Sequence, residues 1–278
     1  MSKGRYLLLK FTTLASGSGG NAAVISCGRT HILLDAGISA RRITTGLKEL
    51  GIEPEQLSAV LVTHDHSDHI CGLAVLTKKL DVPIYATAPT CRTIAEKAPW
   101  AQEQLRPCRP GFSLNLGDVL VESFATSHDA PGSVGYSLCG GGTRMALCTD
   151  LGFVSREVED AIRGCELLVC ESNHDEDWVR TGPYPYYLKQ RVLGDQGHLS
   201  NEAGAELALF AIENGAREVI LAHLSAENNT PAHALRVVGD RLRRAGVDLD
   251  REVRLSVAPR NEMGRTCFLG SEKEVVCQ

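Results

Sequence analysis

Short continuous runs of apolar residues alternate along most of this chain with segments whose apolar residues recur at helical spacing. Runs of the first kind, at 59–62 and 167–170, are typical of strands that are buried on both faces of a sheet. Segments of the second kind, at 38–50 and 200–214, are typical of helices. Because strand and helix signals alternate, the pattern predicts an α/β fold.

The two halves of the chain each begin with β signals and continue with alternating strands and helices. This repetition predicts two mixed β-sheets packed face to face with helices outside, an αββα four-layer sandwich. No linker or low-complexity segment interrupts it, so we expect one domain over residues 1–278, with a short irregular lobe around 172–199. The expected strands are 23–26, 31–34, 59–62, 83–85, 119–124, 134–138, 144–148, 167–170, 219–222 and 253–257, and the expected helices are 38–50, 70–80, 89–98, 155–163, 200–214 and 230–245.

Composition narrows the class of protein. The 278 residues are 43% hydrophobic and 23% charged with a formal net charge of −5, which is typical of a globular chain rather than a disordered one. The mild acidic excess argues against a surface that attracts polyanions everywhere, though not against a local basic track. With 5% aromatic residues, an extended base-stacking platform is not expected.

Nothing in the sequence predicts insertion into a membrane or export. No apolar run approaches the roughly 20 residues that span a bilayer. Lys3 and Arg5 precede an apolar run that Lys10 ends, whereas a secretory signal needs about 7–15 apolar residues. The 10 cysteines are scattered without a CxxC pair, and we expect Cys71 and Cys148 to be small core residues. We therefore expect a cytoplasmic protein with reduced thiols.

The sharpest chemical signal is the sequence THDHSDH at 63–69, directly after the expected strand 59–62. A loop at a strand end can turn several neighbouring side chains into one pocket. Imidazole and carboxylate groups are ligands that suit Zn²⁺ or a similar divalent cation. The alternative is a solvated polar loop, which so dense a histidine cluster disfavours. The candidate ligands in this loop are His64, His66, Asp68 and His69.

The HxHxDH spacing after a strand, with LLDAG upstream at 33–37, resembles the metallo-β-lactamase-fold hydrolases. That family carries a later His, an Asp and a last His at strand ends, which His128, Asp150 and His223 match. The resemblance implies two metal ions, with Asp150 bridging them and Asp35 orienting a ligating imidazole. The implied ligands are His64, His66 and His128 for one ion, and Asp68, His69 and His223 for the other.

Two further motifs resemble the tRNase Z group of the same fold. The sequences GHLS at 197–200 and AHLS at 222–225 are similar to its GHST and HFS elements. Glu171 stands where that group carries a glutamate paired with a histidine. The resemblance implies that His198, paired with Glu171, donates a proton to the leaving oxygen. With Asp68, which is also a ligand, these two residues form the expected catalytic set.

Longer motifs resemble the YycJ (WalJ) family of bacterial cytoplasmic metallo-hydrolases. They are LASGSGGN at 14–21, ESNHD at 171–175, GHLSN at 197–201 and HLSAENNTP at 223–231. The resemblance implies 5′-to-3′ exonuclease action on DNA and a link to DNA repair.

The expected function is therefore a dinuclear phosphodiesterase, a nuclease that acts on DNA rather than RNA, with Zn²⁺ or Mn²⁺ as cofactor and no membrane partner. An alkoxide is a poor leaving group, so an added acid suits a phosphodiester better than a thioester. The alternatives are a thioester or lactone hydrolase on the same scaffold, and a non-catalytic, metal-bearing regulator that binds nucleic acid. The sequence leaves open the oligomeric state and the roles of His174, Tyr184, Tyr186 and Tyr187.

Overall fold

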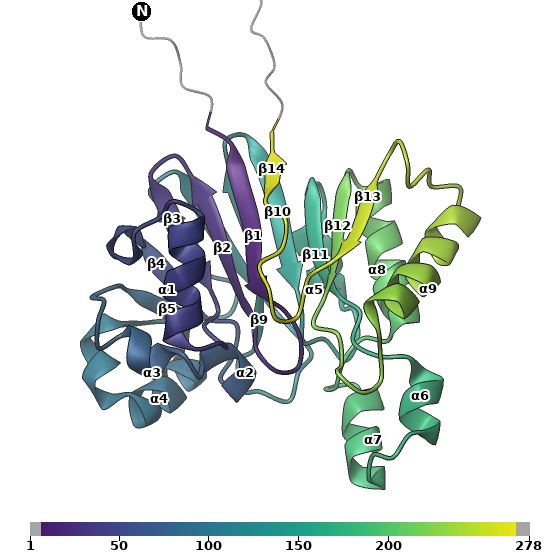
Figure 1. The fold of residues 1–278 in the computed structure, drawn as a ribbon, viewed down its shortest axis with the longest axis horizontal. Coiled ribbons are helices and arrows are strands. Elements are labelled where there is room, and N and C mark those ends of the chain that lie inside the picture. The colour runs from purple at the N-terminus through teal and green to yellow at the C-terminus, as the bar shows by residue number, and fades with distance from the viewer. Residues whose placement is uncertain (1–6, 271–278) are drawn as a thin grey trace, which may run out of the picture.

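The computed structural model describes residues 7–270, whose strands form two seven-stranded sheets (Figure 1). In spatial order, the first sheet consists of β14 (Cys267–Leu269), β1 (Leu9–Ala15), β2 (Ala22–Cys27), β3 (Thr30–Leu34), β4 (Ala59–Leu61), β5 (Ile84–Thr87) and β6 (Leu105–Cys108). The second consists of β13 (Arg254–Val257), β12 (Glu218–Ala222), β11 (Leu167–Glu171), β10 (Thr143–Cys148), β9 (Val134–Gly140), β8 (Val119–Ala125) and β7 (Ser113–Leu116).

Each sheet joins an antiparallel part to a parallel part. Strands β1, β2 and β3 pair antiparallel, with Ala23 opposite Leu34, whereas β3, β4, β5 and β6 run parallel. In the second sheet β7 to β10 are antiparallel, and β10 to β13 are parallel. Parallel neighbours need a crossover connection, which helices supply here. The carboxyl ends of the parallel strands therefore lie along one edge of each sheet.

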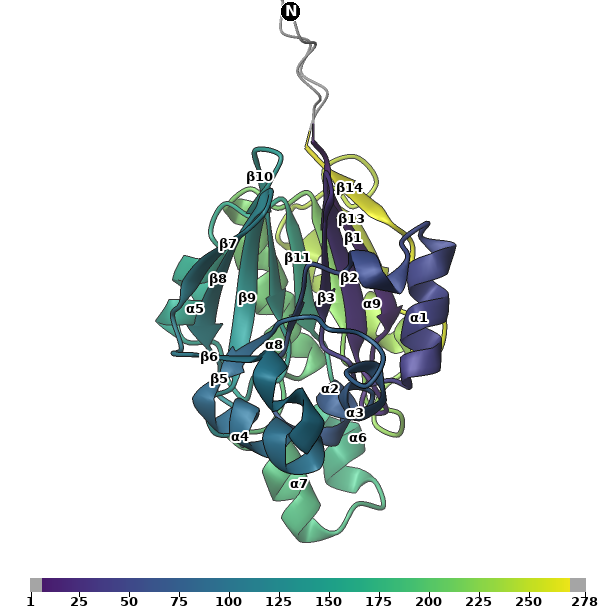
Figure 2. The same cartoon turned by 90° about the vertical axis from the view of Figure 1, so that its left-hand side faces the viewer.

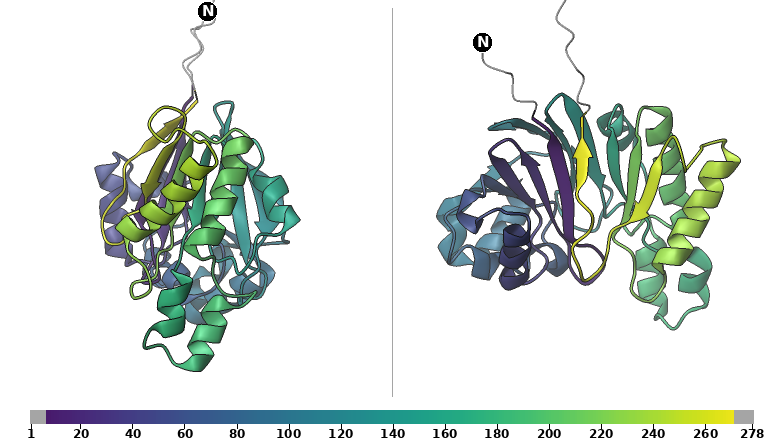
Figure 3. Two further views of the ribbon diagram at one scale, coloured as in Figure 1. Left: turned by 90° about the vertical axis from the view of Figure 1, so that its right-hand side faces the viewer. Right: turned by 45° about the horizontal axis from the view of Figure 1, so that its top comes forward.

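Helices cover the outer faces of both sheets, as Figures 2 and 3 show. One buried cluster fills the space between the two sheets with side chains such as Phe11, Ile25 and Tyr136. A second cluster joins the first sheet to its helices, and a third joins the second sheet to its helices. The first sheet is covered by α1 (Ala40–Glu49), α2 (Ser67–Ile70), α3 (Leu73–Leu76) and α4 (Ala88–Lys97), and the second by α5 (Arg156–Ile162), α8 (Asn201–Glu213) and α9 (Pro231–Arg244). The expected αββα sandwich is confirmed.

Local capping fixes where the helices of the second layer begin. The side chains of Ser155, Ser200 and Thr230 each accept a hydrogen bond from a backbone N–H three residues further on. Pro231 occupies the first position of α9, where its missing N–H costs nothing. Because Ser200 sets the start of α8, it also fixes the loop that carries His198.

Two segments differ from the elements expected from the sequence. The expected helix at 70–80 is two short helices, α2 and α3, because Gly72 interrupts it. The Gly72 N–H donates to the carbonyl of Ala36, and a Cβ at Gly72 would lie 2.1 Å from the carbonyl oxygen of Ile38. The segment 172–199 contains α6 (Glu176–Thr181) and α7 (Tyr186–Leu193), which are too short for periodicity to reveal. Both project from one end of the molecule (Figure 1).

Strands β1, β6, β7 and β14 were not expected. The last three are only three or four residues long. The short 3-10 helices η1 (Pro54–Gln56) and η2 (Pro99–Gln104) complete the described elements.

The cysteines follow the expectation only in part. Cys148 is fully buried, but Cys71 is exposed, because α2 turns it outward at the helix end. The nine cysteines in residues 7–270 are free thiols. Lys3 and Arg5 fall outside the described residues. Within those residues, no helix is long and apolar enough to cross a membrane.

Candidate metal centre

The expected ligands lie in loops that follow strands of both sheets. The loop after β4 carries His64 and His66, the short helix α2 that follows it carries Asp68 and His69, and His128 lies in the loop after β8. Asp150 follows β10, and His223 directly follows β12. Since these loops gather at one edge of the sandwich, residues far apart in the sequence meet there.

All seven expected ligands converge on this edge. They form overlapping groups in which one ligand atom from each residue lies within 4.8 Å of the others. The groups are His64, His66 and His128; Asp68, His69 and His223; His64, His69 and Asp150; and Asp150, Glu171, His198 and His223. The first two groups, here called triad one and triad two, are the sets that the family resemblance implied. The third group joins Asp150 to one member of each triad.

Asp150 lies between the triads. Its Oδ1 is 3.6 Å from Nε2 of His128, in triad one, and its Oδ2 is 3.4 Å from Nε2 of His69, in triad two. Burial alone would favour the protonated acid, but the surrounding imidazoles, with His223 and His69 foremost, hold the pKa of Asp150 well below its usual range. Asp150 is therefore a carboxylate close to both triads, since its Oδ1 also lies 3.6 Å from Nδ1 of His223, in triad two.

Three residues of the site have left-handed backbone. Asp35, Asp150 and His223 have φ values of 57°, 61° and 57°, and within residues 7–270 they are the non-glycine residues with positive φ. Such conformations cost about 1–3 kcal/mol each and concentrate at functional sites. All three lie at or just beyond strand ends, where the sharp turn brings the side chain to the edge of the sheet.

The donor set fits a divalent cation. Two buried atoms of the cluster, Nε2 of His64 and Oδ2 of Asp150, have no hydrogen-bond partner. Burial, reinforced by the neighbouring His69, lowers the pKa of His64 well below its ordinary value, which keeps the imidazole in its neutral, metal-binding form. Buried imidazole and carboxylate atoms that lack partners and face one another are accounted for by a bound metal ion.

Residues behind the triads fix the ligand orientations. The Asp35 carboxylate lies 2.8 Å from Nδ1 of His69, which leaves Nε2 of that ring to face the other ligands. The backbone N–H of Thr63 donates to Asp35 at 2.8 Å. Asn21 donates through Nδ2 to the carbonyl of Gly17 and to the carboxylate of Asp68. Asn21 therefore ties the glycine-rich loop to a ligand.

Glu171 is the most heavily bonded carboxylate of the site. Its Oε1 lies 2.8 Å from Nδ1 of His198 and 2.9 Å from Nδ1 of His223. Its Oε2 accepts from the backbone N–H groups of Leu151 and Leu199 at 2.9 and 3.0 Å. Burial opposes ionisation, but the two imidazoles outweigh it and lower the pKa of Glu171 to about 2. The sequence indicated the pairing with His198 but not the bond to His223.

The triads open into a cavity of about 190 Å³, to which helix α7 contributes a wall. That wall contains Tyr184, just before α7, and Leu188, Arg191 and Val192. The remaining lining comes mainly from the ligands, from His198 and from the loops beside them.

Asp129 and Arg191 also line this cavity, and sequence reasoning had not found them. Arg191 donates through Nε to Asp129 at 2.5 Å, and the other oxygen of Asp129 lies 3.4 Å from Nε2 of His66. Adjacency to His128 could have drawn attention to Asp129. No motif marks Arg191, which lies 62 positions away from its partner.

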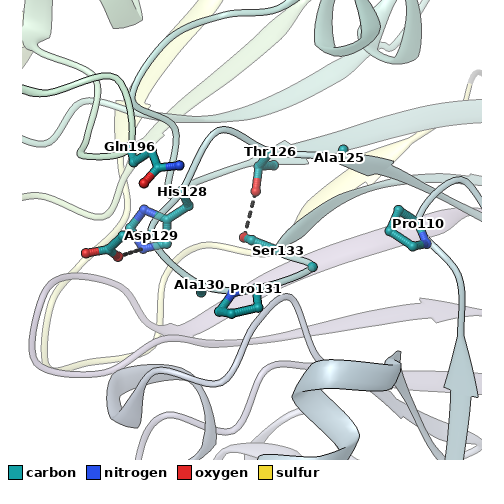
Figure 4. A pocket seen from close by; sticks show the side chains of 10 residues that line it. Pro110, Ala125, Thr126, His128, Asp129, Ala130, Pro131, Ser133 and Gln196 are labelled. Carbon is teal, nitrogen blue, oxygen red and sulfur yellow. Dashed lines mark hydrogen bonds and ion pairs between the residues drawn. The ribbon is translucent and has the colours of Figure 1, made fainter.

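A second, more open cavity of about 400 Å³ adjoins the first (Figure 4). Both cavities are lined by His128, Asp129 and Gln196. The rest of the second cavity is neutral, with Pro110 and Pro131 among its walls, and its Thr126 and Ser133 hydroxyls bond each other at 2.7 Å. His128 therefore borders both cavities.

The structure places the residues whose roles the sequence left open. His174 is buried, and its backbone pairs with Ser200. Burial lowers its pKa to about 4. Tyr184 lines the cavity. Tyr186 and Tyr187 are 75% and 72% exposed, so they do not pack the lobe.

Comparisons with known proteins settle the family. The model of the beta-lactamase superfamily domain matches residues 30–224. Exodeoxyribonuclease WalJ of Streptococcus pneumoniae serotype 2 is 37% identical over 251 residues, which are 88% of this chain and 93% of the relative. The chain belongs to the WalJ/YycJ family. Exodeoxyribonuclease YycJ of Bacillus anthracis is 38% identical over 224 residues, 80% of this chain and 84% of the relative.

Solved structures show the fold of this WalJ/YycJ family member in more distant proteins. Zn²⁺-bound PqqB from Methylobacterium extorquens has a TM-score of 0.68 at 18% identity and covers 94% of this chain and 100% of its own. Human tRNase Z, short form, has a TM-score of 0.62 at 17% identity, with 92% and 98% covered. The metallo-β-lactamase fold expected from the sequence is confirmed.

Proposed function

We propose that this WalJ/YycJ family member is a dinuclear metal-dependent phosphodiesterase that degrades DNA from the 5′ end. The observation that carries the proposal is the His198–Glu171 pair. His198 lines the cavity beside both ligand triads, and the buried Glu171 lies 2.8 Å behind it, at Nδ1. The WalJ and YycJ relatives are named exodeoxyribonucleases, which supports DNA as the substrate. The 5′-to-3′ direction, and a role in DNA repair, rest on the resemblance of the motifs alone.

In this proposal each of two ions has its own ligand group, and we take the ions to be Zn²⁺ or Mn²⁺. When bound, such ions polarise a phosphoryl oxygen and bring the pKa of a water near neutrality. Asp35 selects, through Nδ1 of His69, the ring nitrogen that serves as ligand. The assigned ligands are triad one (His64, His66 and His128) and triad two (Asp68, His69 and His223), with Asp150 shared between them.

His198 supplies the proton that the leaving oxygen needs. Because Nδ1 of His198 is 2.8 Å from Glu171, its Nε2 is the nitrogen free to face the substrate. The buried carboxylate of Glu171 holds the ring in this orientation. As the P–O bond breaks, the proton on Nε2 moves to the leaving alkoxide, which is too basic to depart readily as an anion.

The two adjoining cavities suit a substrate that continues on both sides of the bond to be cleaved. A phosphodiester carries an organic group on each side of phosphorus, and His128 lines both cavities. A thioester hydrolase on this scaffold would have no use for an acid at His198, because a thiolate leaves without a proton.

The proposal is tested with metal-reconstituted protein on bis(p-nitrophenyl) phosphate, and then on DNA and RNA strands labelled at the 5′ or the 3′ end. We expect turnover of the small diester and release of labelled mononucleotides from 5′-labelled DNA before full-length strand is consumed. Acyl-glutathione and a lactone serve as competing substrates. Turnover of either of these, with none of any phosphodiester, would overturn the proposal.

A further inference from the structure

Helix α7 presents one face to the catalytic cavity and another to solvent. Leu188, Arg191 and Val192 line the cavity together with Tyr184, at spacings that fall on one side of a helix. Tyr187 lies one turn before Arg191, at the outer margin of the same face. The helix therefore connects the cavity to the outside of the molecule, at the end where α6 and α7 project (Figure 1).

The solvent side of this helix is unusually aromatic. Tyr186 and Tyr187, at 75% and 72%, are the most exposed large hydrophobic side chains within residues 7–270. Trp178 on α6 is 39% exposed and stacks on His233. Tyrosine rings that are largely exposed in the folded chain, beside a site that accepts a ligand, are available to that ligand.

The charge of α7 favours a polyanion. Between Tyr186 and Leu193 the helix carries Lys189 and Arg191 and no acidic residue. The guanidinium of Arg191 remains about half exposed, with its side chain at 54%, although it pairs with Asp129. On α6, Glu176 forms an ion pair with Arg180, and the arginine neutralises the charge of the Glu176 carboxylate locally.

We propose that α7 is a stacking surface for the unpaired bases of a single-stranded nucleic acid whose cleaved phosphate lies at the ligand triads. This inference rests on the proposed phosphodiesterase function and names the form of its substrate. A strand that leaves the cavity past Arg191 meets Tyr187 about 6 Å further along the helix axis. Bases stack on aromatic rings only when they are unpaired, so the surface selects a single strand over a duplex.

The test measures binding of metal-loaded protein to a fluorescent 12-nucleotide strand with phosphorothioate linkages, which keep the charge and the bases but resist hydrolysis. Tyr187→Ala should raise the Kd about fivefold or more, the lower end of the range for loss of one base–aromatic stack. Tyr187→Phe keeps the ring and should bind like the unmodified protein. Phe268, 60% exposed on β14 at the opposite end of the molecule, provides Phe268→Ala as the matched control, with no expected change.

An abasic strand of the same length separates stacking from contacts with the backbone. On that strand the unmodified protein and Tyr187→Ala should have the same Kd. Equal affinity of the two proteins for the normal strand, or an equal loss on both strands, would overturn the inference. Failure of the proposed function has a different signature, because the unmodified protein would then not hydrolyse bis(p-nitrophenyl) phosphate at all.

Discussion

Replacement of Glu171 by glutamine removes one negative charge at a carboxylate that receives four donors. Oε1 faces the imidazoles of His198 and His223, and Oε2 accepts from two backbone N–H groups. The amide of glutamine has one oxygen and one NH₂ group. In either orientation, the NH₂ group is therefore turned toward two groups that donate in the native protein.

The cost follows from these contacts. Glu171 is fully buried, so water cannot replace a lost partner. A buried donor without an acceptor costs about 1–3 kcal/mol, which predicts a loss of about 2–6 kcal/mol in the free energy of unfolding for two donors. If the NH₂ group faces the imidazoles, His223 also loses the acceptor that orients it, and metal affinity should fall by about 10–100-fold.

The measurement is urea denaturation of Glu171→Gln and of the unmodified protein, both metal-loaded, with metal affinity determined by competition with a chelator. Glu157→Gln is the matched control, since Glu157 is exposed and accepts one hydrogen bond, from the backbone of Ala125. That variant should lose about 0.5 kcal/mol or less. If Glu171→Gln were no less stable than Glu157→Gln and bound metal equally well, the role given to the four contacts would be refuted.

Three further predictions concern the acid, the ligands and the backbone beneath them. His198→Ala should keep both metals but lose about 10²–10⁴-fold in rate on DNA. The loss on bis(p-nitrophenyl) phosphate should be much smaller, because its leaving group departs without a proton. Loss of metal, or equal slowing on both substrates, would show that His198 is a ligand or scaffold residue. His223→Ala should bind one ion fewer than the unmodified protein's two, measured by elemental analysis after dialysis, and an unchanged count would remove it from the ligand set. Gly37→Ala should weaken metal binding, because its Cβ would lie 1.5 Å from the carbonyl oxygen of Asp68; Gly19→Ala, with open space around it, is the control and should bind metal normally.

The sequence predicted those site residues that lie in short local motifs. A single loop, THDHSDH, supplies four of the expected ligands, and its place after a buried strand predicts where they point. The other three were identified by resemblance, and each lies in a loop that follows a strand, which is why all seven meet. The layered fold was predictable for a similar reason, since continuous apolar runs mark the inner strands.

What the sequence did not predict depends on contacts between distant segments. The bond from Glu171 to His223 joins residues 52 positions apart, and the pair of Arg191 and Asp129 joins residues 62 positions apart. Neither has a local pattern. Helices α6 and α7 are six and eight residues long, so hydrophobic periodicity has too few turns in which to appear.

Several positions that break local rules take part in assembling the site. Asp35, Asp150 and His223 take a backbone conformation that most side chains avoid, and His64 and Asp150 bury polar atoms without partners. Each departure costs stability, and nothing in the packing of the two sheets requires them. His64, Asp150 and His223 turn their side chains toward the ligand groups, and Asp35 holds the ring of His69 from behind. If the fold only had to be stable, these positions would relax to unstrained backbone and partnered polar atoms. A cation that binds the native state stabilises it, and this stabilisation offsets the free-energy cost of these positions.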